Sequence, residues 1–118
     1  MTDTVEAGRE RGRVEAARAA LAAHDELRGS EDKGDNFELG YDDLPVDATS
    51  WLEWHEHEYL PAFRVWSEAM YRLAGVLGSE FPGRHPFQFR PVCQRIVAAA
   101  NSVQVGELDD DAPGGGVR

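Results

Sequence analysis

One run of mostly apolar positions dominates this sequence and limits what the chain can fold into. Its steps alternate between three and four residues, a spacing that places side chains on one face of an α-helix. The positions are Leu52, His55, Tyr59, Ala62, Trp66, Ala69, Leu73 and Val76. Phe63, Met70 and Leu77 widen this face, and Gly78 is a natural stop. The spacing predicts one long amphipathic helix over about 51–77.

The start of this helix carries a capping signal, and its middle carries a proline. Ser50 fits the N-cap of a capping box, with Glu53 at the N3 position. Pro61 has no amide hydrogen for the usual helical bond, and it disfavours helical geometry at the residue before it. Because the apolar pattern keeps its phase through Pro61, we favour one kinked helix. Two helices with a break at 59–61 are the alternative.

A shorter helix is predicted over about 13–28, and residues before it are expected to fray. The many alanine residues of this segment favour a helix, and Gly29 is a natural C-terminal stop. Gly8 and Gly12 each cost roughly 1 kcal/mol relative to alanine in a helix, so residues 1–12 are expected to be poorly ordered. The apolar face of the helix is thin and consists of Val14, Ala17, Leu21, His24 and then Leu27 or Arg28.

The last helix is predicted over about 91–105. Pro91 suits the first helical position, and Gly106 suits the end. Residues 107–118 have no apolar period and contain three consecutive Asp and three consecutive Gly, so we expect a disordered tail there. The apolar face of this helix consists of Val92, Ile96, Ala99 or Ala100, and Val103.

Two connecting segments complete the predicted fold. Residues 29–47 form a long acidic loop, in which Phe37, Leu39 and Tyr41 alternate with polar residues. A loop that lies on the helices as a clasp is favoured over a true strand, because no partner strand is evident. Residues 78–90 form an aromatic loop rich in Pro and Gly. The fold class is all-α, with three main helices in a single domain over 13–106.

Charge is unevenly distributed along the chain. The 118 residues carry a formal net charge of −10, with −9 in residues 29–60 and +3 in residues 61–106. This balance argues against a protein that binds nucleic acid over its whole surface. The excess of Arg over Lys fits the composition bias of a GC-rich genome, which is the interpretation we favour. The excess of acid with almost no Lys also fits adaptation to salt, which is the alternative.

Several protein classes are disfavoured by composition. No apolar run is long enough to span a membrane, and residues 1–13 lack the apolar core of a secretory signal. The single cysteine, Cys93, forms no internal disulfide. We therefore expect a cytoplasmic protein without membrane contact.

Few residues form a pattern that carries chemistry. His55 and His57 are two residues apart and point in different directions from a helix, so they do not hold one metal ion together. Gly114, Gly115 and Gly116 lie in the tail and do not form a phosphate-binding loop. We predict no cofactor, no metal ion and no catalytic residue.

Two further interpretations concern buried or reactive side chains. Cys93 lies in the first turn of the last helix near Arg90 and Arg95, an arrangement that makes an exposed thiol reactive. A buried core cysteine is the favoured interpretation, and a reactive thiol is the alternative. His24 and His55 both fall on apolar faces, so a contact between them would create a buried pair that titrates near neutral pH.

The function that the sequence favours is binding. The apolar face of the 51–77 helix exceeds what the slim first helix covers, which points to a partner helix or a second copy. A self-contained three-helix fold is equally compatible with this apolar area. We expect a non-catalytic interaction or self-assembly module that makes contact through Leu52, Tyr59, Phe63, Trp66, Met70 and Leu73. The alternative is an accessory protein of nucleic-acid complexes, because Arg and Phe interleave at Arg84, Phe87, Phe89, Arg90 and Arg95.

Overall fold

The computed structural model describes the chain from residue 2 to residue 111, and the side chains from residue 6 to residue 102. It confirms the all-α fold with three main helical segments. The helices are α1 (Thr2–Asp35), α2 (Ala48–Trp54), a π-helical turn (His55–Tyr59), α3 (Leu60–Leu77), a short 3₁₀ turn (Gly78–Glu80) and α4 (Pro86–Asp111).

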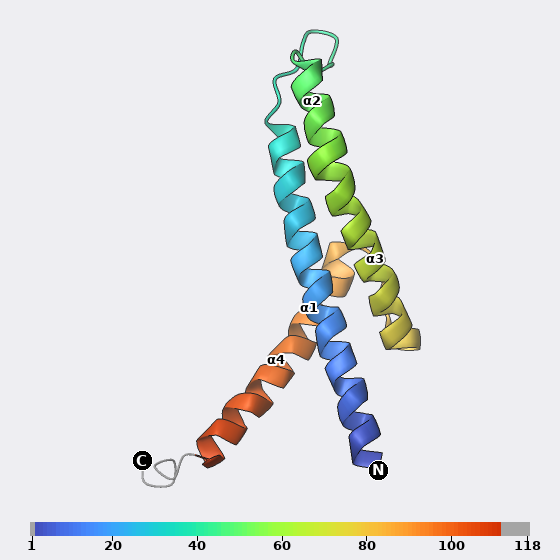
Figure 1. Ribbon diagram of the computed structural model, residues 1–118, viewed down its shortest axis with the longest axis vertical. Helices are drawn as coiled ribbons and strands as arrows, with labels where there is room; N and C mark the ends of the chain where they lie inside the picture. The colour runs from blue at the N-terminus through green and yellow to red at the C-terminus, as the bar shows by residue number, and fades with distance from the viewer. Residues whose placement is uncertain (1, 112–118) are drawn as a thin grey trace.

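The helices form an elongated and open arrangement. α1 and the continuous α2–α3 segment lie side by side and antiparallel, as a long helical hairpin (Figure 1). α4 starts near the middle of this hairpin, contacts α1, and then diverges from it toward the lower end of the view (Figure 1). The molecule measures 67 × 36 × 22 Å. α1 is therefore the central helix, because it contacts both α3 and α4.

The core lies where the three long helices meet. The fully buried side chains that α1 contributes to the cluster are alanines, which allow α3 and α4 to approach its backbone closely, and Leu21 packs against the cluster as a partly buried side chain. The larger apolar volume comes from α3 and α4, whose core side chains are almost completely removed from water. The buried cluster consists of Ala16, Ala17 and Ala20 with Met70, Leu73, Leu77, Phe89 and Cys93.

The first helix is longer than the sequence predicts. It extends through residues 2–12, which were expected to fray, and through Gly29, which was expected to end it. A Cβ atom at Gly8, Gly12 or Gly29 would meet no neighbour, so these glycines are not required by close packing. At the C-terminal end the extension is explained by tertiary contact, because α2 packs against α1 beyond Gly29 and offsets the weak helix propensity.

The second helix begins at a different cap from the predicted one. Asp47 is the N-cap, and its carboxylate accepts bonds from the Ser50 backbone N at 3.1 Å and from Ser50 Oγ at 2.8 Å. The Ser50–Glu53 capping box is therefore wrong. Both Asp and Ser are good cap residues, and the upstream Asp47 takes the role while Ser50 becomes its N3 partner.

We expect Asp47→Ala to lower the melting temperature, because the first turn loses its side-chain acceptor. Hydrogen bonds from the backbone and hydroxyl of Ser50 hold the pKa of Asp47 below its usual value. The carboxylate contribution is therefore present above the ordinary pKa and is lost as the pH falls through the lower, folded value. Thermal unfolding at pH 7 checks this, with Ser50→Ala as the comparison, for which a smaller decrease is expected. Equal melting temperatures for Asp47→Ala and wild type would contradict the assignment.

The second helix continues through Pro61, but its apolar pattern does not keep its phase there. The chain continues through the π turn His55–Tyr59, where the Leu60 amide bonds to the carbonyl of His55. A π turn holds more residues than an α turn, so it accommodates the proline and rotates the buried face. As a result Trp54 is buried while Leu52, a member of the predicted apolar face, is 49% exposed.

The last helix starts earlier and ends later than predicted. Pro86, rather than Pro91, occupies the first helical position, and Pro91 lies inside α4. The turn before it is closed by the side chain of Gln88, which accepts a bond from the His85 backbone N at 3.2 Å. Gly106 does not end the helix. Of the predicted disordered tail, residues 112–118 lie outside the described residues.

The loop that joins α1 to α2 contains no strand. Leu39 and Pro45 form an isolated antiparallel bridge, and Val46 N donates to Glu38 O at 2.9 Å. The predicted clasp is mostly wrong, because Leu39 and Tyr41 are exposed. Only Phe37 packs onto the helices, with its ring 5.8 Å from that of Trp54.

Candidate functional site

Trp54 joins the upper end of α1 to α2. Its Nε1 donates to the backbone oxygen of Ser30 at 3.0 Å, which satisfies the indole amide. The six-membered part of the ring lies directly over Gly34, where a Cβ atom would overlap it. Glycine is thus required at position 34, and this contact fixes the distance between the two arms of the hairpin.

A continuous row of rings runs along one edge of the α2–α3 segment. Trp51 stacks on His55 at 4.9 Å between centroids, and His55 stacks on Tyr59 at 5.5 Å. Tyr59 lies 6.1 Å from Phe63, which lies 5.6 Å from Trp66. We call Trp51, His55, Tyr59, Phe63 and Trp66 the aromatic ladder. Steps of four residues, and of three between Phe63 and Trp66, bring successive rings together on the helix surface.

The upper part of the aromatic ladder borders an open groove against α1. This groove, the aromatic groove, has a volume of about 500 Å³ and is walled by Trp51, Trp54, His55 and Tyr59 on one side. Three exposed carboxylates of α1 face it, and we call Glu31, Asp32 and Asp35 the acidic rim. Arg28 is the basic side chain of the lining. The site therefore combines aromatic faces with negative charge.

The segment that forms the upper half of the hairpin carries most of the negative charge of the sequence. Residues 25–60 contain twelve acidic residues against Arg28 and Lys33, a formal charge of −10 that equals that of the whole chain. Lys33 is already paired, with its Nζ 2.7 Å from an oxygen of Glu58. The upper half of the hairpin is thus a concentrated negative field next to exposed rings.

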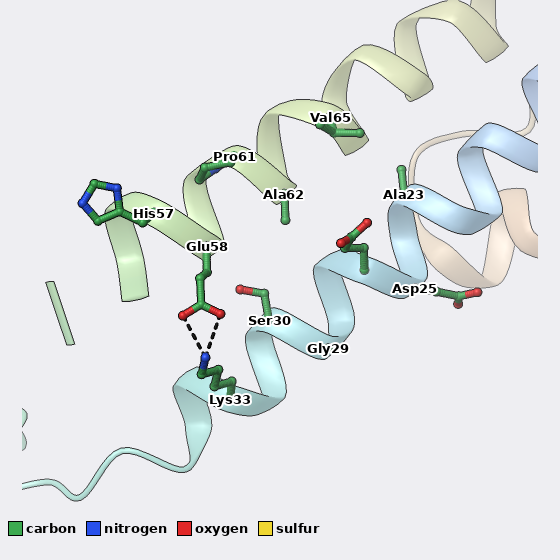
Figure 2. Close-up of a pocket in the computed structure, with 11 residues that line it drawn as sticks. Ala23, Asp25, Gly29, Ser30, Lys33, His57, Glu58, Pro61, Ala62 and Val65 are labelled. Carbon is green, nitrogen blue, oxygen red and sulfur yellow. Dashed lines mark hydrogen bonds and ion pairs between the residues drawn. The ribbon is translucent and has the colours of Figure 1, made fainter. Parts of the chain in front are cut away.

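A second groove lies on the other side of the hairpin, between α1 and the start of α3. It has a volume of about 730 Å³, and the Lys33–Glu58 pair spans it (Figure 2). His57 points away from that pair, and Ser30 Oγ is buried without a hydrogen-bond partner (Figure 2). A nucleophile needs an adjacent base, and the described side chains place none at Ser30.

The structure separates the six predicted partner-binding residues into two groups. Met70 and Leu73 lie in the core against α1, so they are not available to a partner in this fold. Phe63 and Leu52 are exposed, and Tyr59 and Trp66 are half-buried. Tyr59, Phe63 and Trp66 are brought together in the aromatic ladder, while Leu52 lies outside it.

The prediction missed Trp51 and the acidic rim as parts of this surface, and it placed His55 on the apolar face without including it among the partner-binding residues. Trp51, His55, Tyr59 and Phe63 follow one another at intervals of four, and this signal is present in the sequence. The alternating steps of three and four residues obscured this regular spacing, because they begin at Leu52 rather than at Trp51. The acidic rim lies in a segment that was expected to be a loop, so its fixed position next to the rings was not predicted.

The residues of the nucleic-acid alternative do not form one surface. Phe89 is buried in the core, and Arg90 is bound inside the fold by Asp25 at 3.0 Å. The Arg84 guanidinium lies over Trp66, 5.2 Å from the ring centroid. Phe87 and Arg95 are exposed on α4. Three of the five side chains are therefore engaged in contacts within the chain.

His24 and His55 do not form the predicted pair. His24 is buried beside Phe89, with ring centroids 5.3 Å apart, and its Nδ1 lies 2.9 Å from Arg90 Nη1. Since a guanidinium only donates, Nδ1 must accept, which leaves the proton on Nε2 of a neutral ring. Burial, followed by the charges of Arg90 and Arg28, lowers the pKa of His24. His55 lies in the aromatic ladder instead.

A pH dependence of stability follows from His24. The unfolded chain takes up a proton on this residue at a higher pH than the folded chain does. We therefore expect the free energy of unfolding to fall as the pH drops below the ordinary value of 6.5 toward the lower, folded pKa. Urea unfolding between pH 7.5 and 5 measures this slope. His24→Asn, which keeps an acceptor near Nδ1, should flatten it, and His57→Asn, at an exposed site, should not. An unchanged slope in His24→Asn would exclude His24 as the cause.

Cys93 is a core residue rather than a reactive thiol. It is completely buried between the helices. Burial raises the pKa of the thiol, and the charge of Arg90 opposes this only in part. The burial of Cys93 thus agrees with the favoured interpretation of a core cysteine, and the exposed position that a reactive thiol requires is not found in this structure.

The described part of the chain contains neither a cluster of metal ligands nor a helix that could span a membrane. Among the described residues no group of three His, Cys, Asp or Glu side chains is arranged to hold a metal ion. No helix within residues 2–111 is long and apolar enough to cross a membrane. Comparison of the chain with protein-family models, curated proteins and solved structures finds no match.

Proposed function

We propose that this chain is a non-catalytic protein-interaction module of the cytoplasm that binds its partner through the aromatic ladder and the aromatic groove. The observation that carries the proposal is a row of rings that the chain's own helices leave half uncovered. Phe63 is 40% exposed, and Trp51, His55 and Tyr59 are half-buried. Tyr and Trp side chains are enriched among the central contacts of protein interfaces.

The rigidity of the upper hairpin supports the same proposal. The upper hairpin is held by Trp54 and by the Lys33–Glu58 pair, so the aromatic ladder sits on a defined surface rather than on a loose segment. A rigid helical surface binds with a small loss of conformational entropy. The nucleic-acid alternative has no comparable support, since the fold uses Phe89 and Arg90 internally.

Capture from an extract of the source cells tests the proposal with matched variants. Phe63→Ser removes a ring from the aromatic ladder, and Phe87→Ser removes an exposed ring from α4. We expect the proteins captured by the wild type to be retained by Phe87→Ser and lost with Phe63→Ser, with or without nuclease. Equal capture by both variants would overturn the assignment of the surface.

A further inference from the structure

We infer that the partner binds the aromatic groove through an arginine-bearing segment, with guanidinium groups stacked on the aromatic ladder and paired with the acidic rim. This inference rests on the proposed function and adds the chemistry of the partner. It joins three observations: rings and exposed carboxylates that line the same groove, and an arginine that the chain itself places over the last ring of the same row.

The charge of the groove selects a cationic partner. Glu31, Asp32 and Asp35 are exposed, and no ion pair joins any of them to another side chain in the described part of the chain. The surrounding field is negative, and Arg28 offsets only one of the three charges of the acidic rim. An anionic or neutral segment would therefore leave these carboxylates without a partner, whereas a basic one complements them.

The choice of arginine over lysine comes from the lower end of the aromatic ladder. There the Arg84 guanidinium lies 5.2 Å from the ring centroid of Trp66 and 5.4 Å from that of Tyr71. The chain thus covers the last ring of the ladder with an arginine of its own. His55 is stacked between Trp51 and Tyr59, whereas no cation of the described residues lies over the outer rings Trp51, Tyr59 and Phe63. A planar guanidinium stacks on a ring and forms paired bonds to a carboxylate, which an ammonium does not do.

The length of the uncovered part sets the size of the segment. From Trp51 to Phe63 the helix rises by about 18 Å at the usual 1.5 Å per residue, or slightly more than three turns. A partner helix of that length, with arginines at intervals of about four residues, presents a row of guanidinium groups that matches the row of rings.

Binding of defined peptides to the full chain tests this inference. The probe is an 18-residue alanine-based helical peptide with arginine at every fourth position, compared with the same peptide carrying lysine or glutamate. Titration calorimetry should show saturable binding of the arginine peptide, binding weaker by about threefold or more for lysine, and none for glutamate. Higher salt should weaken the interaction.

Charge-matched variants locate the binding. Asp32→Asn combined with Asp35→Asn should weaken arginine-peptide binding about three- to tenfold, because two charged contacts are lost. Glu53→Gln combined with Glu56→Gln removes the same charge from side chains that line neither groove, and should change binding little. Circular dichroism checks that both variants keep their helices. Equal weakening by the two pairs would mean attraction by net charge alone and would overturn the inference.

Two other outcomes separate this inference from the proposed function. Absence of arginine-peptide binding, while capture still depends on Phe63, would overturn the arginine partner and leave the interaction surface in place. A particle of twice 13.1 kDa in light scattering that Phe63→Ser splits would assign the aromatic ladder to a second copy of the chain and would also overturn the inference.

Discussion

Gly34→Ala is expected to destabilise the protein by about 1–3 kcal/mol, the usual effect of forcing an extra group into a filled site. The new Cβ atom would overlap the Trp54 indole, which has little freedom to move away. The indole Nε1 donates to the backbone oxygen of Ser30 at 3.0 Å. On the side of the aromatic ladder, the centroid of the Tyr59 ring lies 5.4 Å from that of the Trp54 ring. Displacement of the ring would break that bond and separate the upper ends of α1 and α2.

Gly29→Ala is the matched control for this prediction. Gly29 lies in the same helix, and a Cβ atom there would meet nothing. Replacing an exposed helical glycine with alanine should stabilise the protein by about 0.5–1 kcal/mol. Urea unfolding followed by tryptophan fluorescence measures both variants. If Gly34→Ala proved as stable as Gly29→Ala, the close packing of Trp54 over position 34 would be wrong.

Phe89→Ala should have the largest effect of any single truncation, a loss of about 3–5 kcal/mol. Phe89 is the largest completely buried side chain, and it joins α4 to the alanine face of α1. Its ring also covers His24 in an edge-to-face contact at 5.3 Å. Without it, a cavity would open at the junction of the three helices and α4 would lose its main anchor.

Phe87 provides the comparison two residues away. It is 72% exposed on the same helix, so Phe87→Ala should change the free energy of unfolding by less than about 0.5 kcal/mol. Should Phe89→Ala fail to fold, Phe89→Leu keeps most of the volume and should show a smaller loss. Equal effects of truncation at positions 87 and 89 would contradict the docking of α4.

The helical class could be predicted from the sequence because the apolar spacing of 52–76 leaves few alternatives. The boundaries could not, because several residues compete for the same local role. Asp47 and Ser50 both suit an N-cap, and Pro86 and Pro91 both suit a first helical position. In each pair the upstream residue takes the role in the structure.

The candidate site was less predictable because it depends on how the helices pack. Met70 and Phe63 both fall on the wide apolar face, and only the position of α1 decides that Met70 is buried while Phe63 is exposed. The π turn before Pro61 rotates the face further, which replaces Leu52 with Trp54 as the buried residue. No local pattern encodes either effect.

The measurement that tests the central claim most directly is site-specific photocrosslinking in the source cells. A photoreactive phenylalanine analogue is placed at position 63 in the aromatic ladder, or at the more exposed position 87 as a control. We expect a defined adduct heavier than the 13.1 kDa chain from position 63 and none from position 87. No adduct from position 63, or the same adducts from both positions, would contradict the aromatic ladder as the interaction surface.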